Sequence, residues 1–268
     1  MRRRPLGHTL ARWVLLVFVG GYLLLPLVAM AEFSTRGDFG SRSLDAWIAI
    51  ADDPNLVEAI IVTISIAALT AIGMLLLLVP TMAWTYIRVP ALKRPVEFLC
   101  LLPLAIPAVV LVVGIVPIYS ILSRATRGNP LTLVLIDIIL VLPFAHRAID
   151  AGMKSIDVPT LAEAARSLGA SWPRVMFQII APNLRGAILS AAVISVALVL
   201  GEFTISSLLN YDTLQVVINL LGKRDSFIAV AVSLAALIFA FVLVLGIAII
   251  GAERRRSSEE PIAEVLAP

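Results

Sequence analysis

Long uncharged apolar runs, separated by shorter polar stretches, make up most of the chain. A transmembrane helix needs about 20 predominantly apolar residues, and runs of about this length recur along the sequence. The pattern therefore predicts an all-α polytopic membrane protein with six transmembrane helices. The predicted spans are residues 13–30, 57–87, 96–122, 131–145, 183–209 and 227–250.

The third run differs from the others in its prolines. Pro103, Pro107 and Pro117 all fall inside it, together with Gly114. Proline removes a backbone donor and kinks a helix, and a membrane tolerates this where a neighbour or a cavity satisfies the freed carbonyl groups. Two interpretations stay open here: simple bends for packing, and a broken helix beside a transport path.

Residues 161–182 interrupt the apolar pattern with regularly spaced charges. Links between helices are usually about 2–8 residues, whereas this segment has 22, so its length predicts a partner outside the membrane. Thr160 and Glu163 have the spacing of a capping box, with Thr160 as the N-cap. Gly169 suits the left-handed position after a helix. The segment is thus predicted to be a two-turn helix, a hinge at Gly169, and a second helix that Pro182 ends.

The remaining polar stretches predict loops and tails. The first apolar run ends in a small-x-small pattern at residues 29–31, so a signal peptide is an alternative to a retained first span. The other predicted parts are a cytoplasmic N-terminus at residues 1–12, external loops at 32–55 (with a short interfacial helix at 43–50) and 210–226, and a disordered cytoplasmic tail at 251–268.

The distribution of Lys and Arg predicts the orientation of the spans. Six spans place both termini on one side, and this side, which includes residues 161–182, carries fifteen of the 21 basic side chains. The opposite side carries six. Because cytoplasmic loops are enriched in Lys and Arg, both termini and residues 161–182 are predicted to be cytoplasmic. From physics alone, an amphipathic hairpin on the membrane surface is an alternative for this segment.

Composition narrows the classes of function. The 268 residues are 60% hydrophobic and 15% charged, too apolar for an ordinary soluble domain. One cysteine, Cys100, excludes an intrachain disulfide and a cysteine-based metal site. The chain has no catalytic cluster, no histidine-rich metal-ligand pattern and no phosphate-binding loop of the G-x4-G-K-S/T type. We therefore expect no enzymatic activity, no metal or cofactor bound by this chain, and no nucleic-acid partner.

Two acidic residues, Asp137 and Glu202, fall inside predicted spans, and both lie toward the external side. Charges within a membrane are costly and usually face an interior or a cavity. One interpretation is that each pairs with a hydroxyl, amide or backbone donor at an interface with a second membrane subunit. The other is that they line a path, with Ser206 and Asn210 nearby, and meet a cationic substrate or a gating donor.

A known motif matches the cytoplasmic segment. Glu163-Ala164-Ala165 is followed by Gly169 four positions after Ala165, and then by Ile179 and Pro182. This spacing resembles the EAA motif of the permease subunits of binding-protein-dependent type I ABC importers. Ala181 departs from the motif, which usually has leucine there. The resemblance covers about residues 57–250 and implies a MetI-like fold.

The resemblance implies a mechanism and a set of partners. The EAA segment would be a coupling helix that docks on a cytoplasmic ATPase, within a multi-pass protein of the bacterial inner membrane. Two ATP-binding subunits holding ATP and Mg²⁺, a second permease chain (giving a heterodimer) and an external substrate-binding protein would complete the importer. The residues assigned to coupling are Thr160, Leu161, Glu163, Ala164, Ala165, Arg166, Leu168 and Gly169.

A second, shorter resemblance bears on the substrate. Gly201-Glu202-Phe203, followed by Thr204, Ser206 and Ser207, looks like the fifth-span segment of permeases for polyamines, ferric iron, phosphonates, sulfate and molybdate. Two acidic residues favour a polyamine such as spermidine or putrescine, with ferric iron, phosphonate and the oxyanions as alternatives. An ATP-independent secondary transporter is a more remote alternative, since internal inverted repeats are not evident.

Overall fold

The apolar runs fold into long helices. The structure is a computed structural model that describes residues 6–36 and 41–265, and within these ranges the regular elements are helices, with no β-strand. The described helices divide between two units, one formed by Met1–Val57 and Val217–Phe239 and the other by Glu58–Val216 and Ala240–Pro268. We call them unit 1 and unit 2. Residues 1–5 of the predicted N-terminus and 266–268 of the predicted tail lie outside the described residues.

The described helices confirm the all-α polytopic prediction. Five are long and apolar enough to cross a membrane, or six if one pair that bends by 77° counts as a single span. The candidate spans lie in α1 (Leu6–Ser34), α3 (Pro54–Ile87), α5 (Ala108–Ala125), the stretch Pro130–Ser155 that includes α6 (Leu133–Ser155), and α13 (Ser226–Val265); the bent pair joins Trp172–Asn183 to α10 (Arg185–Leu200).

Unit 1 includes α1 and the short helix α2 (Asp45–Asp52), which matches the predicted interfacial helix within two residues at each end. The Trp47 indole donates a hydrogen bond to the Ser34 hydroxyl over 3.2 Å, which ties α2 to the end of α1. Phe33 stacks on Phe227 with ring centroids 5.0 Å apart. These contacts join the end of the first span to the beginning of α13.

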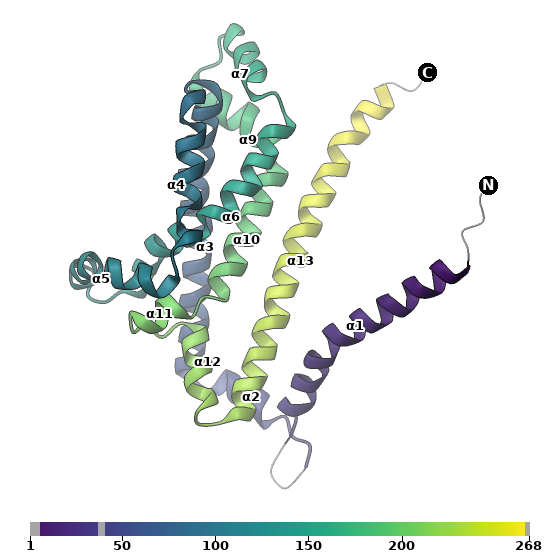
Figure 1. Cartoon of the computed structure of the whole chain (residues 1–268), viewed down its shortest axis with the longest axis vertical. Helices are drawn as coiled ribbons and strands as arrows, with labels where there is room; N and C mark the ends of the chain where they lie inside the picture. The colour runs from purple at the N-terminus through teal and green to yellow at the C-terminus, as the bar shows by residue number, and fades with distance from the viewer. Residues whose placement is uncertain (1–5, 37–40, 266–268) are drawn as a thin grey trace. The chain divides into compact units, whose positions relative to one another are not determined.

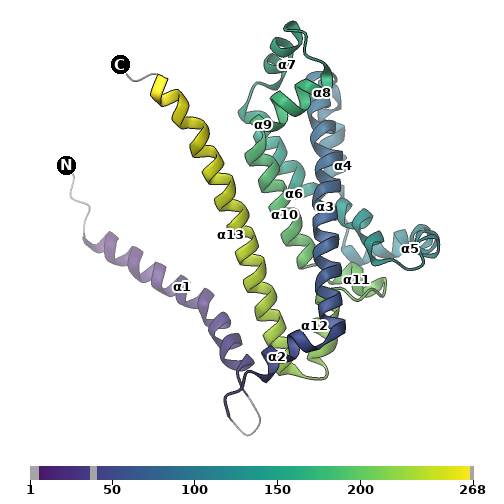
Figure 2. The ribbon, with the colours of Figure 1, turned by 180° about the vertical axis from the view of Figure 1, so that it is seen from behind.

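Unit 2 is built around α6. This helix packs against α4 (Lys93–Ala105) and against α10, and these helices run side by side in Figure 1 and Figure 2. Ile136, Val141 and Ile149 on α6 are at most 1% exposed. Gly152 allows α10 to come close, because a Cβ atom there would collide with the Ala187 side chain.

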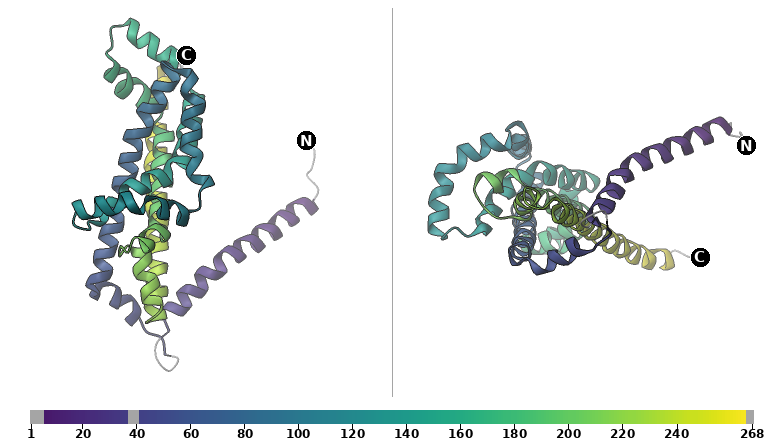
Figure 3. Two further views of the ribbon diagram at one scale, coloured as in Figure 1. Left: turned by 60° about the vertical axis from the view of Figure 1, so that its left-hand side comes forward. Right: turned by 90° about the horizontal axis from the view of Figure 1, so that it is seen from below.

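The third predicted span is broken in the structure. α4 ends at Ala105, Ile106 and Pro107 have extended backbone, and α5 begins at Ala108. α5 then runs across the direction of α6, as Figure 1 and Figure 3 show. Pro103 and Pro117 stay inside helices, so the break lies at Pro107, whose preceding residue is biased toward extended backbone. The helix is therefore broken, as the second interpretation predicted, while a transport path beside it stays a prediction.

The last helix is longer than its apolar run. The sequence predicts a span ending at residue 250 and a disordered tail from 251, whereas α13 continues to Val265. The tail contains Glu, Arg and Ala, which are favourable residues in a helix. Composition alone did not reveal this continuation.

Candidate functional site

The predicted coupling helix is α7, which spans Val158–Ser167. It lies at one end of unit 2, beyond the ends of α6 and α10 (Figure 1 and Figure 2). Its N-cap is Asp157, whose carboxylate accepts from the Thr160 backbone N–H over 3.3 Å and from the Thr160 hydroxyl over 2.7 Å. The hydrogen bond from the Thr160 hydroxyl is the main reason that the pKa of Asp157 lies below its usual value.

The predicted capping box was therefore wrong. Thr160 lies inside the first turn of α7 and is not its N-cap. The physical reason is Pro159, which fits the first turn of a helix because the backbone donor it lacks would be unpaired there anyway. The helix thus begins before Pro159, and the next polar residue upstream, Asp157, caps it. Glu163 makes no reciprocal cap and its side chain is exposed.

α7 has one face packed and one face open. Val158 and Ala162 are fully buried where α7 packs on the π-helical segment η4 (Val175–Ile180). Leu168, just past the last turn, is 89% exposed. The other coupling residues divide accordingly: Leu161 and Ala165 are half-buried, while Thr160, Glu163, Ala164, Arg166 and Gly169 are exposed.

The end of α7 is fixed by a hydrogen-bonded turn. Gly169 has a φ of +84°, which confirms the predicted left-handed position. The Gly169 N–H donates to the Arg166 carbonyl over 2.9 Å and the Ala170 N–H to the Ala165 carbonyl over 3.0 Å. These two bonds are the pattern of a Schellman motif. An ordered turn therefore fixes Leu168 in its exposed position.

The chain after Gly169 is less regular than expected. It forms α8 (Trp172–Arg174), then η4, then α9 (Ala181–Asn183). Pro182 lies within α9, so the helical path ends at Asn183 and not at the proline. The bend of 77° then leads into α10. π-helical turns often occur at functional positions, and this one lies between α7 and a membrane helix.

The second group of predicted residues lies at the other end of α10. This helix stops at Leu200, and Glu202 follows in a break before α11 (Thr204–Leu208). One Glu202 oxygen accepts from the Ile205 N–H over 2.6 Å; the other accepts from the Ser206 N–H over 3.0 Å and from the Ser206 hydroxyl over 2.8 Å. The fifth predicted span, 183–209, is thus interrupted, and Glu202 and Ser206 are in contact.

Asn210 and Asp137 have different surroundings. Asn210 is exposed, with a φ of +60°, in the turn that follows α11. Asp137, in the second turn of α6, is 3% exposed, and its Oδ1 atom has no hydrogen-bond partner. The structure therefore encloses Asp137 within its own subunit.

Sequence reasoning missed Tyr119, Thr132 and Ser123, which form a cluster of hydroxyl groups with Tyr211. The Tyr119 and Thr132 hydroxyls share a hydrogen bond, and the Tyr211 hydroxyl lies 3.3 Å from that of Ser123. The Tyr119 and Tyr211 rings meet edge to face at 6.2 Å. These contacts join the end of α5, the beginning of α6 and the turn after α11. Their only sequence signal is that they are polar residues in or beside apolar runs.

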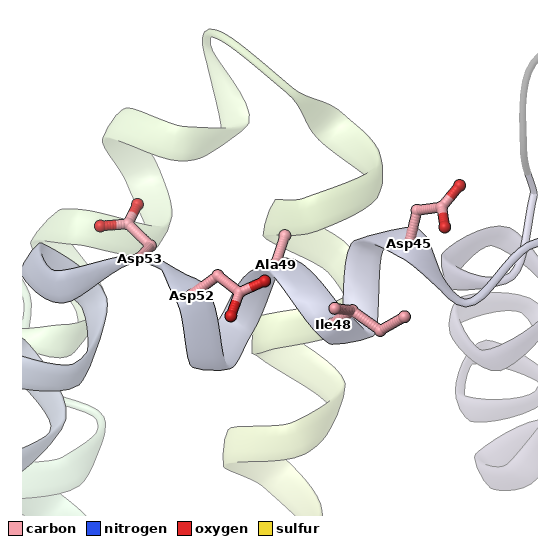
Figure 4. A pocket seen from close by; sticks show the side chains of 5 residues that line it. All are labelled: Asp45, Ile48, Ala49, Asp52 and Asp53. Atoms are coloured by element: carbon pink, nitrogen blue, oxygen red, sulfur yellow. The ribbon is translucent and has the colours of Figure 1, made fainter.

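Two cavities lie elsewhere. One of about 370 Å³ follows α2 in unit 1; Figure 4 shows Asp45 at one end of the helix and Asp52 and Asp53 at the other, so the three carboxylates do not converge. The second, of about 240 Å³, lies in unit 2 between α3, α4 and α6. There Asp150 accepts from the Tyr86 hydroxyl over 2.7 Å and pairs with Lys154 at 2.6 Å.

In the part of the chain that the structure describes, no group of three or more His, Cys, Asp or Glu side chains is placed to hold a metal ion.

Comparison with known proteins identifies the family. A family model described as "binding-protein-dependent transport system inner membrane component" matches residues 77–257, which is more than half of the chain. A search of curated proteins found no match. The matched range includes α7 and the interruptions of the helical chain at Pro107, at Gly169 and at Glu202.

Proposed function

Because the chain belongs to the family of inner membrane components of binding-protein-dependent transport systems, we propose that α7 is the element through which it couples to an ATPase. The chain is thus a multi-pass permease subunit of an ABC importer. The subunit's part in transport would be to form half of a pathway that a second, related permease chain completes. ATP and Mg²⁺ would bind to two cytoplasmic ATPase subunits, and a binding protein would deliver the substrate from outside.

The exposure of Leu168 is the observation that supports this coupling role best. Its side chain is 89% exposed at the end of a helix whose open face otherwise carries small or polar residues such as Ala164 and Ser167. Complete burial of a leucine side chain is favourable by roughly 1.5–3 kcal/mol. A groove on a partner would gain this energy without a rearrangement of α7, because the turn at Gly169 already holds Leu168 in place.

The coupling role implies alternating access. When ATP brings two ATPases together, the two docked α7 helices would move with them, and the permease halves would change from inward-facing to outward-facing. A ligand shifts such an equilibrium only by binding one state more tightly than the other. The loaded binding protein would therefore bind best to the state that closed ATPases favour.

A substitution at Leu168 tests this role. We expect Leu168→Asp to abolish co-purification of the ATPase, because a carboxylate would have to lose its water in an apolar groove. Leu92→Asp is the matched control, since Leu92 is an exposed leucine (47%) of the loop between α3 and α4. It should leave the complex intact. Normal co-purification of Leu168→Asp, or full transport by the purified chain without an ATPase, would contradict the proposal.

We further propose that the substrate is a polyamine that passes the interrupted end of the fifth span. The supporting observations are that Glu202 lies in the break before α11 beside Ser206, and that Asp137 is buried with one carboxylate oxygen that has no hydrogen-bond partner, so Asp137 keeps an acceptor for a cationic group. Glu202 also occupies the N-terminus of α11 with its own negative charge, which disfavours an oxyanion at this position. Ferric iron, phosphonate, sulfate and molybdate are the other substrates to test.

The substrate-binding protein that works with this permease would offer the direct test of the substrate. We expect spermidine or putrescine to raise its melting temperature, while ferric iron, phosphonate, sulfate and molybdate leave it unchanged. Stabilisation by an oxyanion alone would contradict the polyamine assignment and leave the coupling role of α7 untouched.

A further inference from the structure

Two arginines and two tryptophans are in contact with one another at the end of unit 2 that holds α7. The Arg166 guanidinium lies 5.1 Å from the centre of the Trp172 ring, and that of Arg88 lies 4.5 Å from it. Arg88 is also 5.9 Å from the Trp84 ring, and the two tryptophans meet edge to face at 6.2 Å. We call Arg166, Trp172, Arg88 and Trp84 the Trp–Arg column.

We propose that Trp172 is a positioning residue that transmits the movement of α7 to α3. The proposal rests on the docking role of α7 proposed above. The proposal adds a route by which the movement of α7 reaches the membrane helices, because the column connects α7 to α3, which is far from it in the sequence. Guanidinium groups are attracted to the faces of indole rings, so each neighbour in the column holds the next.

The column spans the hinge at the end of α7. Arg166 precedes Gly169 and Trp172 follows it, so their contact connects the two sides of a glycine whose φ is +84°. Arg166 is itself fixed, because its Nη1 donates to the Ala170 carbonyl over 2.8 Å. The turn at Gly169 and the packing of α7 on η4 already limit the rotation of this short helix, and the contact between Arg166 and Trp172 adds a side-chain link across the turn. With Trp172 in place, a push on the open face of α7 would reach α8 and Arg88 as well.

α3 is a suitable receiver for this movement. Trp84 and Arg88 lie in and just after its last turn, next to Met82 and Ala83, which are at most 2% exposed. The same helix meets α6 closely further along, where a Cβ atom on Gly73 would lie 2.7 Å from the Ile138 side chain. A displacement of the Trp84 end would therefore be passed on to the packed helices of unit 2.

Membrane anchoring is the other explanation for two tryptophans at a helix end, since tryptophan is enriched at membrane interfaces. Anchoring would depend on the indole rings alone. It would not depend on Arg88, whereas the column includes the contacts of Arg88 with both rings in addition to the direct contact between the rings. The two explanations therefore differ in what the removal of Arg88 does.

The experiment uses the complete importer in liposomes, with both permease chains, the ATPases and the loaded binding protein. The measured quantities are co-purification of the ATPase and the stimulation of ATP hydrolysis by the loaded binding protein. We expect Trp172→Leu to keep the ATPase bound but to lower this stimulation about tenfold, the size of a modest coupling between sites. Arg88→Gln should have the same effect, and the double variant should be no worse than either single one.

Two further variants complete the test. Trp172→Phe should retain most of the stimulation, because phenylalanine also offers a ring face to both arginines. Phe177→Leu is the matched control, since Phe177 is a 72% exposed aromatic residue of η4 outside the column; it should behave as the wild type does.

Several results would overturn the proposal. Normal stimulation in Trp172→Leu or in Arg88→Gln would exclude the column as a route, and additive losses in the double variant would exclude action through one contact. Loss of ATPase binding in Trp172→Leu would assign Trp172 to docking itself. If the wild-type chain bound no ATPase at all, the proposed function would fail and the role of the column would fail with it.

Discussion

The chain of unit 2 is interrupted after α7, at Gly169, and again after α10, at Gly201. At the first interruption the turn leaves Leu168 exposed to water and Glu163 without a hydrogen-bond role in the cap. At the second, both oxygens of Glu202 accept hydrogen bonds from the following turn. The Glu163 carboxylate is thus free for a partner, whereas the Glu202 carboxylate is used for hydrogen bonds within the subunit.

This difference indicates which surroundings suit the α7 end of unit 2 and which suit the Glu202 end. An exposed apolar side chain on an ordered turn suits a protein groove, since burial of leucine on binding is favourable. A carboxylate that accepts three hydrogen bonds suits the membrane interior, where an unsatisfied polar group is expensive. The side chain of Gln215 also stabilises the region around Glu202, because it donates to the Leu200 carbonyl at the end of α10 over 3.0 Å.

The largest expected effect of a substitution is at Glu202. Glu202→Ala removes the acceptor of three hydrogen bonds and leaves the Ile205 and Ser206 N–H groups unpaired, so we expect a loss of about 3 kcal/mol of stability. The measurement is the unfolding transition of the purified chain in detergent. Glu163→Ala is the matched variant on α7 and should leave the transition unchanged. Equal stability of both variants would remove the contrast between the two ends.

The next largest effect is on coupling and not on stability. Glu163→Lys reverses an exposed charge on the open face of α7, so we expect the transport-coupled ATPase activity to fall about tenfold, which corresponds to about 1.4 kcal/mol of lost interaction. Glu58→Lys, at an exposed carboxylate in the second turn of α3, is the control outside α7 and should leave the activity unchanged. A Glu163→Lys variant that unfolds more easily than wild type would mean that this side chain has a structural role instead.

The two ends also differ in how far the sequence predicted them. The span pattern and the left-handed Gly169 followed from residue types, because apolar runs and a glycine after a helix are local signals. The interruption at Glu202 did not, because residues 183–209 are apolar enough for one continuous span, and only the hydrogen bonds of Glu202 show where it stops. The cap of α7 was misassigned for a similar reason: Thr160 and Asp157 both suit the role, and the tolerated Pro159 decides between them.

The long-range contacts were beyond sequence reasoning altogether. Trp84 and Trp172 are 88 positions apart, and nothing in either local pattern indicates that they meet. Likewise, Asp137 was recognised as a charge in a membrane span, but its enclosure among helices of its own subunit depends on how α5, α6 and α11 pack. Periodicity and composition report on single elements, whereas these contacts depend on the arrangement of several.

A smaller effect separates the two glycines. Gly169 has a φ of +84°, which side chains with a Cβ atom disfavour, so Gly169→Ala should cost about 1 kcal/mol. Gly201 has a φ of −93°, and a Cβ atom there would meet the Ala197 carbonyl at an ordinary 3.6 Å. Gly201→Ala should therefore be close to neutral. Both are measured by the same unfolding transition, and a reversed order would contradict the assigned turn geometry.

The smallest effect is the pH dependence of the α7 cap. The hydrogen bond from the Thr160 hydroxyl is the main cause that lowers the pKa of Asp157 from its usual 3.8. Because the folded pKa is the lower one, the stabilisation by the cap is complete above pH 3.8 and is lost as the pH falls through the folded value.

Amide hydrogen exchange in α7, compared between wild type and Asp157→Asn, should show protection in the wild type that declines only in this acidic range. Asp157→Asn keeps an acceptor without the charge, so its protection should not change with pH there. A decline that begins near neutral pH would show that a group other than Asp157 controls the beginning of α7. The protection of α11, whose first turn is capped by Glu202, offers a comparison within the same experiment.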